Sequence, residues 1–127
     1  WAMVPEIVEA SDRLMEEGIF ANVINVTGPG PLYRAYQERV RASANNGAPL
    51  SEFMADVVSA SERDAPVVTV VDGHPHTLAW IGSALNTTTM PLGVTEFGQS
   101  GSRPELYKEY GIDVDSIMAV SFAALGM

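Results

Sequence analysis

The sequence predicts a domain of the α/β class, a three-layer α/β/α sandwich around a mostly parallel sheet. Short apolar runs typical of strands alternate along the chain with stretches whose apolar residues recur at helical spacing. Strands that alternate with helices pair in parallel through right-handed crossovers. The clearest strand, residues 67–71, is a continuous apolar and β-branched run, which is typical of a strand covered on both faces in the centre of such a sheet.

Length and composition narrow the class of protein. The 127 residues have the size of one domain, so we expect a single unit over residues 1–127. Sixteen acidic and seven basic side chains give a net charge of -9, which disfavours nucleic acid and anionic membrane surfaces as partners. The absence of cysteine excludes thiolate zinc sites and cysteine nucleophiles. Without a membrane-length apolar run or a secretory signal, we expect a soluble, cytoplasmic chain.

The first half of the chain predicts a helix, a strand and a long helical connection. Apolar residues at helical spacing indicate a helix over residues 5–17 that Gly18 ends, and the apolar run that follows predicts a strand over residues 19–26. The predicted inner face of this helix is formed by Ile7, Ala10, Leu14 and Met15. The Gly-Pro-Gly-Pro run at residues 28–31 predicts a rigid turn, because prolines lack the amide donors of a phosphate loop. Two helices, over residues 32–43 and around residues 53–58, then make the connection.

The second half predicts two further rounds of strand and helix. After the strand at residues 67–71, we expect a short helix over residues 77–85 and a short strand over residues 90–94. Ser102 and Glu105 have the spacing of a capping box, which predicts the start of the next helix. Asp113 then caps a last helix of apolar character.

The order of these elements predicts that one strand is missing. The sequence opens almost directly with a helix, whereas a doubly wound unit normally opens with the strand that leads into that helix. We therefore expect a strand ahead of Trp1, and we interpret the chain as a fragment of a larger protein.

One candidate site lies at the end of the best strand. Asp72, His74 and His76 follow residues 67–71 at the carboxyl edge of the sheet, where α/β folds place ligands. The imidazoles could bind a metal or act in an independent hydrolase. No further histidine and no cysteine is present to complete a transition-metal shell, so a surface loop oriented by Asp72 is favoured over a metal site.

A second candidate is a glycine- and serine-rich loop before the helix that starts near residue 103. Its amides and one arginine could hold a small anion, as in a regulatory module. The capping box explains the same sequence without a ligand, and this structural interpretation is favoured. The residues of the loop are Gly98, Ser100, Gly101, Ser102 and Arg103.

The second half of the chain resembles the C-terminal domain of the transketolase family, which includes transketolase and the decarboxylating component of pyruvate dehydrogenase. Short motifs with family-like spacing carry the resemblance, and it covers most of residues 67–117. They are Leu-Gly-Val at 92–94, Phe-Gly-Gln-Ser-Gly at 97–101, Glu-Leu at 105–106, Tyr-Gly-Ile-Asp at 110–113 and Ser-Ile at 116–117.

The resemblance implies a structural role for this chain. In the family, thiamine diphosphate and a divalent metal such as Mg²⁺ bind in the two preceding domains, between the subunits of a homodimer. The Gly-Asp-Gly motif for their diphosphate and metal is absent, since Val71 precedes Asp72-Gly73. We expect no catalytic, cofactor-binding or metal-binding residue here. The domain would brace the parent enzyme's pyrimidine-binding domain and second subunit, which would cover Trp80, Met90 and Phe97.

Overall fold

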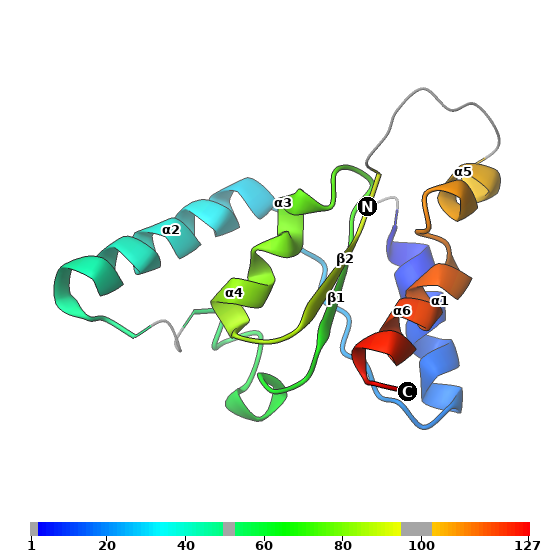
Figure 1. Ribbon diagram of the computed structural model, residues 1–127, viewed down its shortest axis with the longest axis horizontal. Helices are drawn as coiled ribbons and strands as arrows, with labels where there is room; N and C mark the ends of the chain where they lie inside the picture. The colour runs from blue at the N-terminus through cyan, green and yellow to red at the C-terminus, as the bar shows by residue number, and fades with distance from the viewer. Residues whose placement is uncertain (1–2, 50–52, 95–102) are drawn as a thin grey trace.

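The computed structural model describes residues 3–49, 53–94 and 103–127 as a small α/β fold (Figure 1). Helices dominate it, and two short strands form its sheet. In chain order the elements are α1 (Val4–Glu16), α2 (Pro29–Asn46), a 3₁₀ helix (Ala60–Glu62), β1 (Val67–Val70), α3 (His76–Ala79), α4 (Ile81–Leu85), β2 (Thr89–Leu92), α5 (Arg103–Glu109) and α6 (Val114–Ala124).

Helix α1 confirms the first predicted helix. Pro5 occupies the first turn, where its missing N–H costs nothing, and Gly18 follows the helix with a left-handed φ of +80°. Ala10 and Leu14 are buried on its inner face. The sequence also predicted Met15 on that face, which is wrong, because Met15 is exposed.

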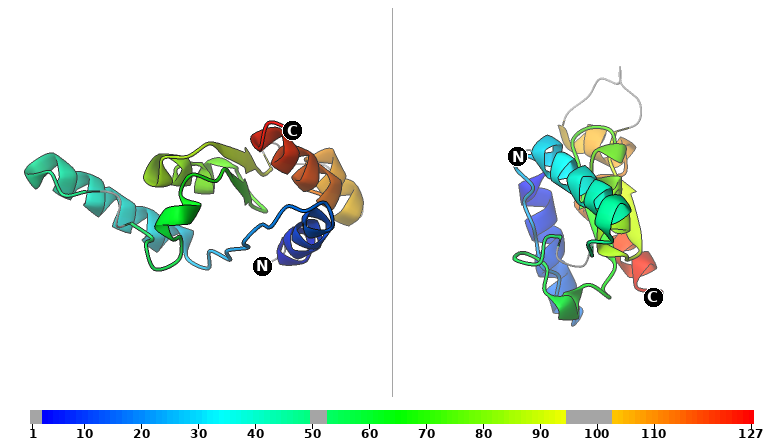
Figure 2. Two further views of the ribbon diagram at one scale, coloured as in Figure 1. Left: turned by 90° about the horizontal axis from the view of Figure 1, so that it is seen from below. Right: turned by 90° about the vertical axis from the view of Figure 1, so that its left-hand side faces the viewer.

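The sheet consists of β1 and β2, which pair in parallel with Val67 opposite Thr89. Helices α3 and α4 form the crossover between them and lie on one side of the sheet, while α1 and α6 lie on the other (Figures 1 and 2). The strand over residues 67–71 is therefore confirmed, but its predicted central position is not observed. Within the described residues, β1 has a strand on one edge alone.

The crossover returns tightly at the end of β2. A Cβ atom at Gly93 would overlap the carbonyl oxygen of Gly73 and would lie 2.8 Å from the backbone nitrogen of Pro75. The N–H of Val94 donates to that same carbonyl oxygen at 2.6 Å. Glycine is therefore required at residue 93, because the two chain segments approach too closely for a side chain between them.

Two predicted elements are not formed. Residues 19–26 were predicted as a strand, but they form no strand and no hydrogen-bonded ladder with β1. Residues 53–58, predicted as a helix, form turns ahead of the 3₁₀ helix. The predicted helix over residues 77–85 is divided into α3 and α4 at Trp80.

The C-terminal helices close the core on the α1 side. Asp113 caps α6 as predicted, since its carboxylate accepts the N–H of Ser116 at 3.2 Å. Ile112 is fully buried in a cluster with Met3, Val94 and Tyr107. A second cluster, of Val58, Ile81 and Leu85, lies on the α4 side of the sheet.

Helix α2 projects away from the rest of the molecule (Figures 1 and 2). It begins at Pro29, three residues earlier than predicted, and Gly47 ends it with a φ of +73°. None of its residues is buried. Its attachment is aromatic: Tyr36 stacks on Trp80 with ring centroids 5.2 Å apart, and Tyr33 lies 5.3 Å from the same ring. Within the described residues, no helix is both long enough and apolar enough to cross a membrane.

Candidate functional site

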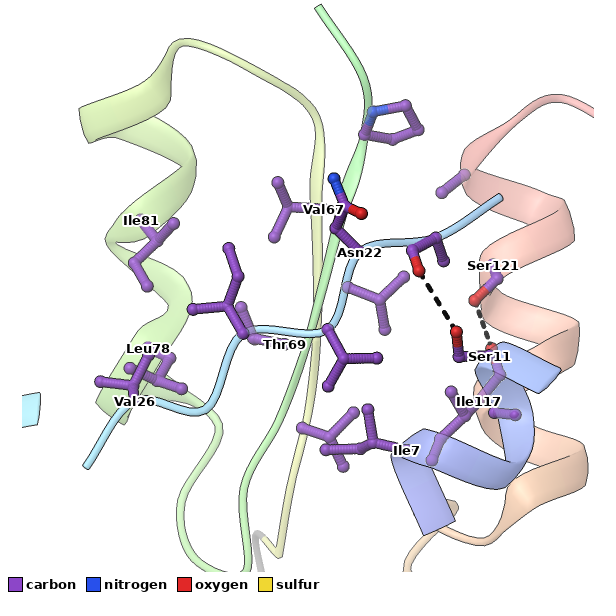
Figure 3. Close-up of a pocket in the computed structure, with 18 of the residues that line it drawn as sticks. Ile7, Ser11, Asn22, Val26, Val67, Thr69, Leu78, Ile81, Ile117 and Ser121 are labelled. Carbon is purple, nitrogen blue, oxygen red and sulfur yellow. Dashed lines mark hydrogen bonds between the residues drawn. The ribbon is translucent and has the colours of Figure 1, made fainter. Parts of the chain in front are cut away.

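A cavity with a volume of about 550 Å³ lies beside the sheet, between its two groups of helices (Figure 3). Its walls are mostly apolar. Ile7 and Ile117 line it from α1 and α6, and Leu78 and Ile81 line it from α3 and α4. The segment that joins α1 to α2 closes the cavity on the side opposite β1.

The cavity follows the free edge of β1. All five residues from Val67 to Val71 line it, although successive side chains of a strand point to opposite faces. A cavity on one face would be lined by alternate residues, so this one must lie along the strand's edge. The N–H groups of Val67 and Val71 donate toward β2, to the carbonyls of Thr88 and Leu92.

By the alternation of a parallel ladder, the N–H and C=O groups of Val68 and Val70 point the other way, toward the cavity. Among the described residues none is hydrogen bonded to these groups. The free edge of β1 is therefore an unpaired row of backbone donors and acceptors, which is costly to leave away from water.

The opposite wall of the cavity, residues 19–26, also has a largely unpaired backbone. All eight of its residues line the cavity. The N–H of Ile19 donates to the carbonyl of Leu14, and the carbonyl of Ala21 accepts the hydroxyl of Ser11 at 3.2 Å. The described residues make no other hydrogen bond to the backbone of this segment. Two unpaired stretches of backbone thus flank one apolar cavity.

Thr69 adds an unsatisfied side chain. The residue is 6% exposed and lies among those that line the cavity (Figure 3). Its hydroxyl is buried and has no hydrogen-bond partner within the described structure. A buried hydroxyl without a partner costs about 1–3 kcal/mol, so its retention in the middle of β1 requires an explanation.

We expect the Thr69→Val substitution to stabilise the chain. Valine has the shape of threonine without the hydroxyl, so the change removes an unpaired polar atom and leaves the packing nearly intact. The free energy of unfolding in urea should rise by about 1 kcal/mol. Ser121→Ala serves as the control, because the Ser121 hydroxyl is already bonded, to the carbonyl of Ile117 at 2.7 Å, and this change should bring no gain. A loss of stability in Thr69→Val would show that the hydroxyl is paired.

The histidine pair predicted from the sequence is brought together, but on the surface. His74 and His76 are exposed, with ring centroids 4.5 Å apart, and the N–H of His76 donates to Nδ1 of His74 at 3.2 Å. Asp72 lines the cavity, whereas neither imidazole does. In the part of the chain that the structure describes, no group of three or more His, Cys, Asp or Glu residues could hold a metal ion.

The predicted anion loop falls mostly outside the described residues. Gly98, Ser100, Gly101 and Ser102 belong to residues 95–102, and Arg103 is the first residue of α5. Phe97, which we expected to need a covering neighbour, lies in the same stretch. Trp80 was expected to need one too; in the structure it is half-buried, and rings of this chain pack against it.

The sequence did not reveal the cavity. Its walls come from segments far apart in the chain, and periodicity describes single elements. One signal was present: the sequence predicted a strand over residues 19–26, and these apolar residues form one wall of the cavity without pairing with β1. No protein-family model matches this chain, and no curated protein and no solved structure matches it.

Proposed function

We propose that the chain is a non-catalytic C-terminal domain of a thiamine-diphosphate enzyme of the transketolase type, and that a strand of the parent enzyme completes its sheet. The two unpaired stretches of backbone on either side of the apolar cavity carry the proposal. A strand laid between them would join residues 19–26 to β1 and would give a sheet of four strands with helices on both faces.

The alternative for such a cavity is a small apolar ligand, since binding pockets are concave and mostly apolar. A ligand of that kind would leave the backbone of Val68 and Val70 unpaired, whereas a strand would satisfy it. The unpaired backbone of β1 therefore favours a strand over a small ligand.

The direction of the strand follows from the position of α1. Helix α1 starts at the end of the molecule where β1 and β2 end (Figures 1 and 2). A strand that led directly into it would therefore run parallel to β1. The result would be the three-layer α/β/α sandwich that the sequence predicts.

The place of this domain in the parent rests on the motif series of residues 92–117, which resembles the transketolase family. Thiamine diphosphate and Mg²⁺ would bind in the other domains, and the parent would decarboxylate ketoacids or transfer ketol groups. This domain would brace the pyrimidine-binding domain and the second subunit. Exposed apolar side chains such as Phe20, Val23 and Ile24 would find their cover in that assembly.

A grafted strand tests the proposal. The sequence Thr-Val-Ile-Ile-Val-Thr, joined through a short Gly-Ser linker ahead of Trp1, should fill the cavity and pair with β1. We expect the free energy of unfolding to rise by about 2 kcal/mol, because burial of the strand's apolar side chains in the cavity, together with about four hydrogen bonds, should exceed the entropy of ordering the strand. Hydrogen exchange should show new protection at the amides of Val68 and Val70.

The matched control is a graft of equal length in which prolines replace the second and fourth residues, which removes the amide donors and retains apolar bulk. Equal stabilisation by the two grafts would show that the cavity takes any apolar filler and would count against a strand. Calorimetry with thiamine diphosphate and Mg²⁺ tests the rest: we expect no binding to the isolated chain, and tight binding with turnover would reject a purely structural role.

A further inference from the structure

The side chain of Thr69 points toward the side of the sheet on which α3 and α4 lie. Val70 packs against the core cluster that contains Ile112, whereas Val67 packs against the cluster that contains Ile81 of α4. Alternate residues of a strand share a face, so Thr69 points to the same side as Val67. Figure 3 shows Thr69 on that side of β1, where the cavity runs beside the strand.

The neighbours of Thr69 on this side give its hydroxyl no partner. The hydroxyl is buried and has no hydrogen bond within the described residues. Its register partner in β2 is Pro91, whose side chain has no hydrogen-bonding group, and Leu78 and Ile81 line the cavity with apolar side chains. A water molecule needs about two to four polar partners to be held in a cavity, and the walls of this one are mostly apolar. The open edge of β1 is the direction from which a partner can come.

We propose that Thr69 selects the strand that completes the sheet, by pairing its hydroxyl with a threonine or serine at the neighbouring position of that strand. This inference rests on the proposed function, because it requires a strand at the open edge of β1. Paired strands lie about 4.8 Å apart, and their neighbouring side chains point to the same face. A hydroxyl on the incoming strand would therefore lie within hydrogen-bonding reach of Thr69, as in cross-strand threonine pairs.

The same geometry gives the pattern of the whole strand. Side chains that point to the same side as the hydroxyl meet Leu78 and Ile81, and those that alternate with them meet Ile7 and Ile117. Both faces are apolar, so the strand that fits is an apolar, β-branched run with one threonine or serine near its middle. A wholly apolar strand would fill the cavity but would leave the hydroxyl of Thr69 buried and unpaired. The group that destabilises the isolated chain thus discriminates between strands.

A series of grafted strands tests this inference. The base graft is Lys-Val-Val-Val-Val-Lys, joined ahead of Trp1 through the same Gly-Ser linker, and four further grafts replace one valine at a time by threonine. Each graft is made in the wild type and in Thr69→Val, and the folding equilibrium constant is obtained from urea unfolding. At one of the four positions, the ratio of this constant between the threonine graft and the base graft should be about tenfold larger in the wild type than in Thr69→Val. The reason is that two buried hydroxyls satisfy each other only when both are present.

The other three positions are internal controls, and their ratios should agree between the two backgrounds within about twofold. Thr69→Ser is the conservative variant: it keeps the hydroxyl and should keep the preference for threonine at the same position. Ratios that are independent of the residue 69 substitution at all four positions, or a preference lost in Thr69→Ser, would overturn selection by Thr69. In that case a base graft that still stabilises the chain and protects the amides of Val68 and Val70 would leave the strand proposal intact. Failure of every graft to stabilise the chain would overturn both.

Discussion

Replacing Trp80 with alanine is expected to lower the free energy of unfolding by about 3 kcal/mol, the low end of the cost for a large aromatic residue, because Trp80 is only half-buried. The ring holds helix α2 to the body of the protein. Tyr36 stacks on it, Tyr33 tilts against it, and Phe53 meets it edge-on at 6.0 Å. Since α2 has no buried residue of its own, its helical structure should be lost before the rest of the chain unfolds.

The measurement is urea unfolding followed by far-ultraviolet circular dichroism, with proteolysis to report the release of α2. Trp80→Phe is the matched variant, because a smaller ring keeps part of the stacking and should cost about 1 kcal/mol. The indole N–H, which donates to the carbonyl of Thr77 at 2.9 Å, is lost in both variants and therefore does not distinguish them. An alanine variant as stable and as helical as the wild type would refute the role of the ring.

The Gly93→Ala substitution is expected to destabilise the chain by about 3 kcal/mol, the upper end of the usual cost of overpacking. The new methyl group would overlap the carbonyl oxygen of Gly73, a backbone atom that cannot turn aside as a flexible side chain can. Relief of the overlap would move the loop after β1 away from β2 and would break the hydrogen bond from Val94 to Gly73.

Gly73→Ala is the control for this prediction. A Cβ atom at Gly73 would meet nothing within 4 Å, and the residue has no left-handed φ, so its substitution should change the free energy of unfolding by less than about 0.5 kcal/mol. The two glycines thus meet in one contact but should respond very differently to the same chemical change. Equal and small effects in urea unfolding would show that the strand end and the loop are free to separate.

Elements that depend on local chemistry could be predicted from the sequence. Helix α1 follows from apolar periodicity and from Gly18, and α6 follows from the cap at Asp113. The strand at residues 67–71 follows from its β-branched run. In each case the residues that determine the element lie within it or next to it, so the local sequence is sufficient to predict it.

Features that depend on distant residues could not be predicted in this way. A strand is stabilised by hydrogen bonds to a neighbouring strand. Residues 19–26 have the composition of a strand but no hydrogen-bonded partner strand among the described residues. The contact between Tyr36 and Trp80 joins residues 44 positions apart, so no periodicity within α2 indicates it. The apolar character of the cavity walls was visible in the sequence, but their enclosure of a common space was not.

The free edge of β1 has a consequence for handling the protein in the laboratory. Residues 67–71 are uncharged, lack proline and are strongly inclined to extended structure, which is the profile of segments that stack into cross-β fibres. Natural proteins usually protect such edge strands with lysine, proline or a covering element. Concentrated preparations should therefore form thioflavin-positive aggregates through this segment. A strand paired with it would prevent this aggregation as well as complete the sheet.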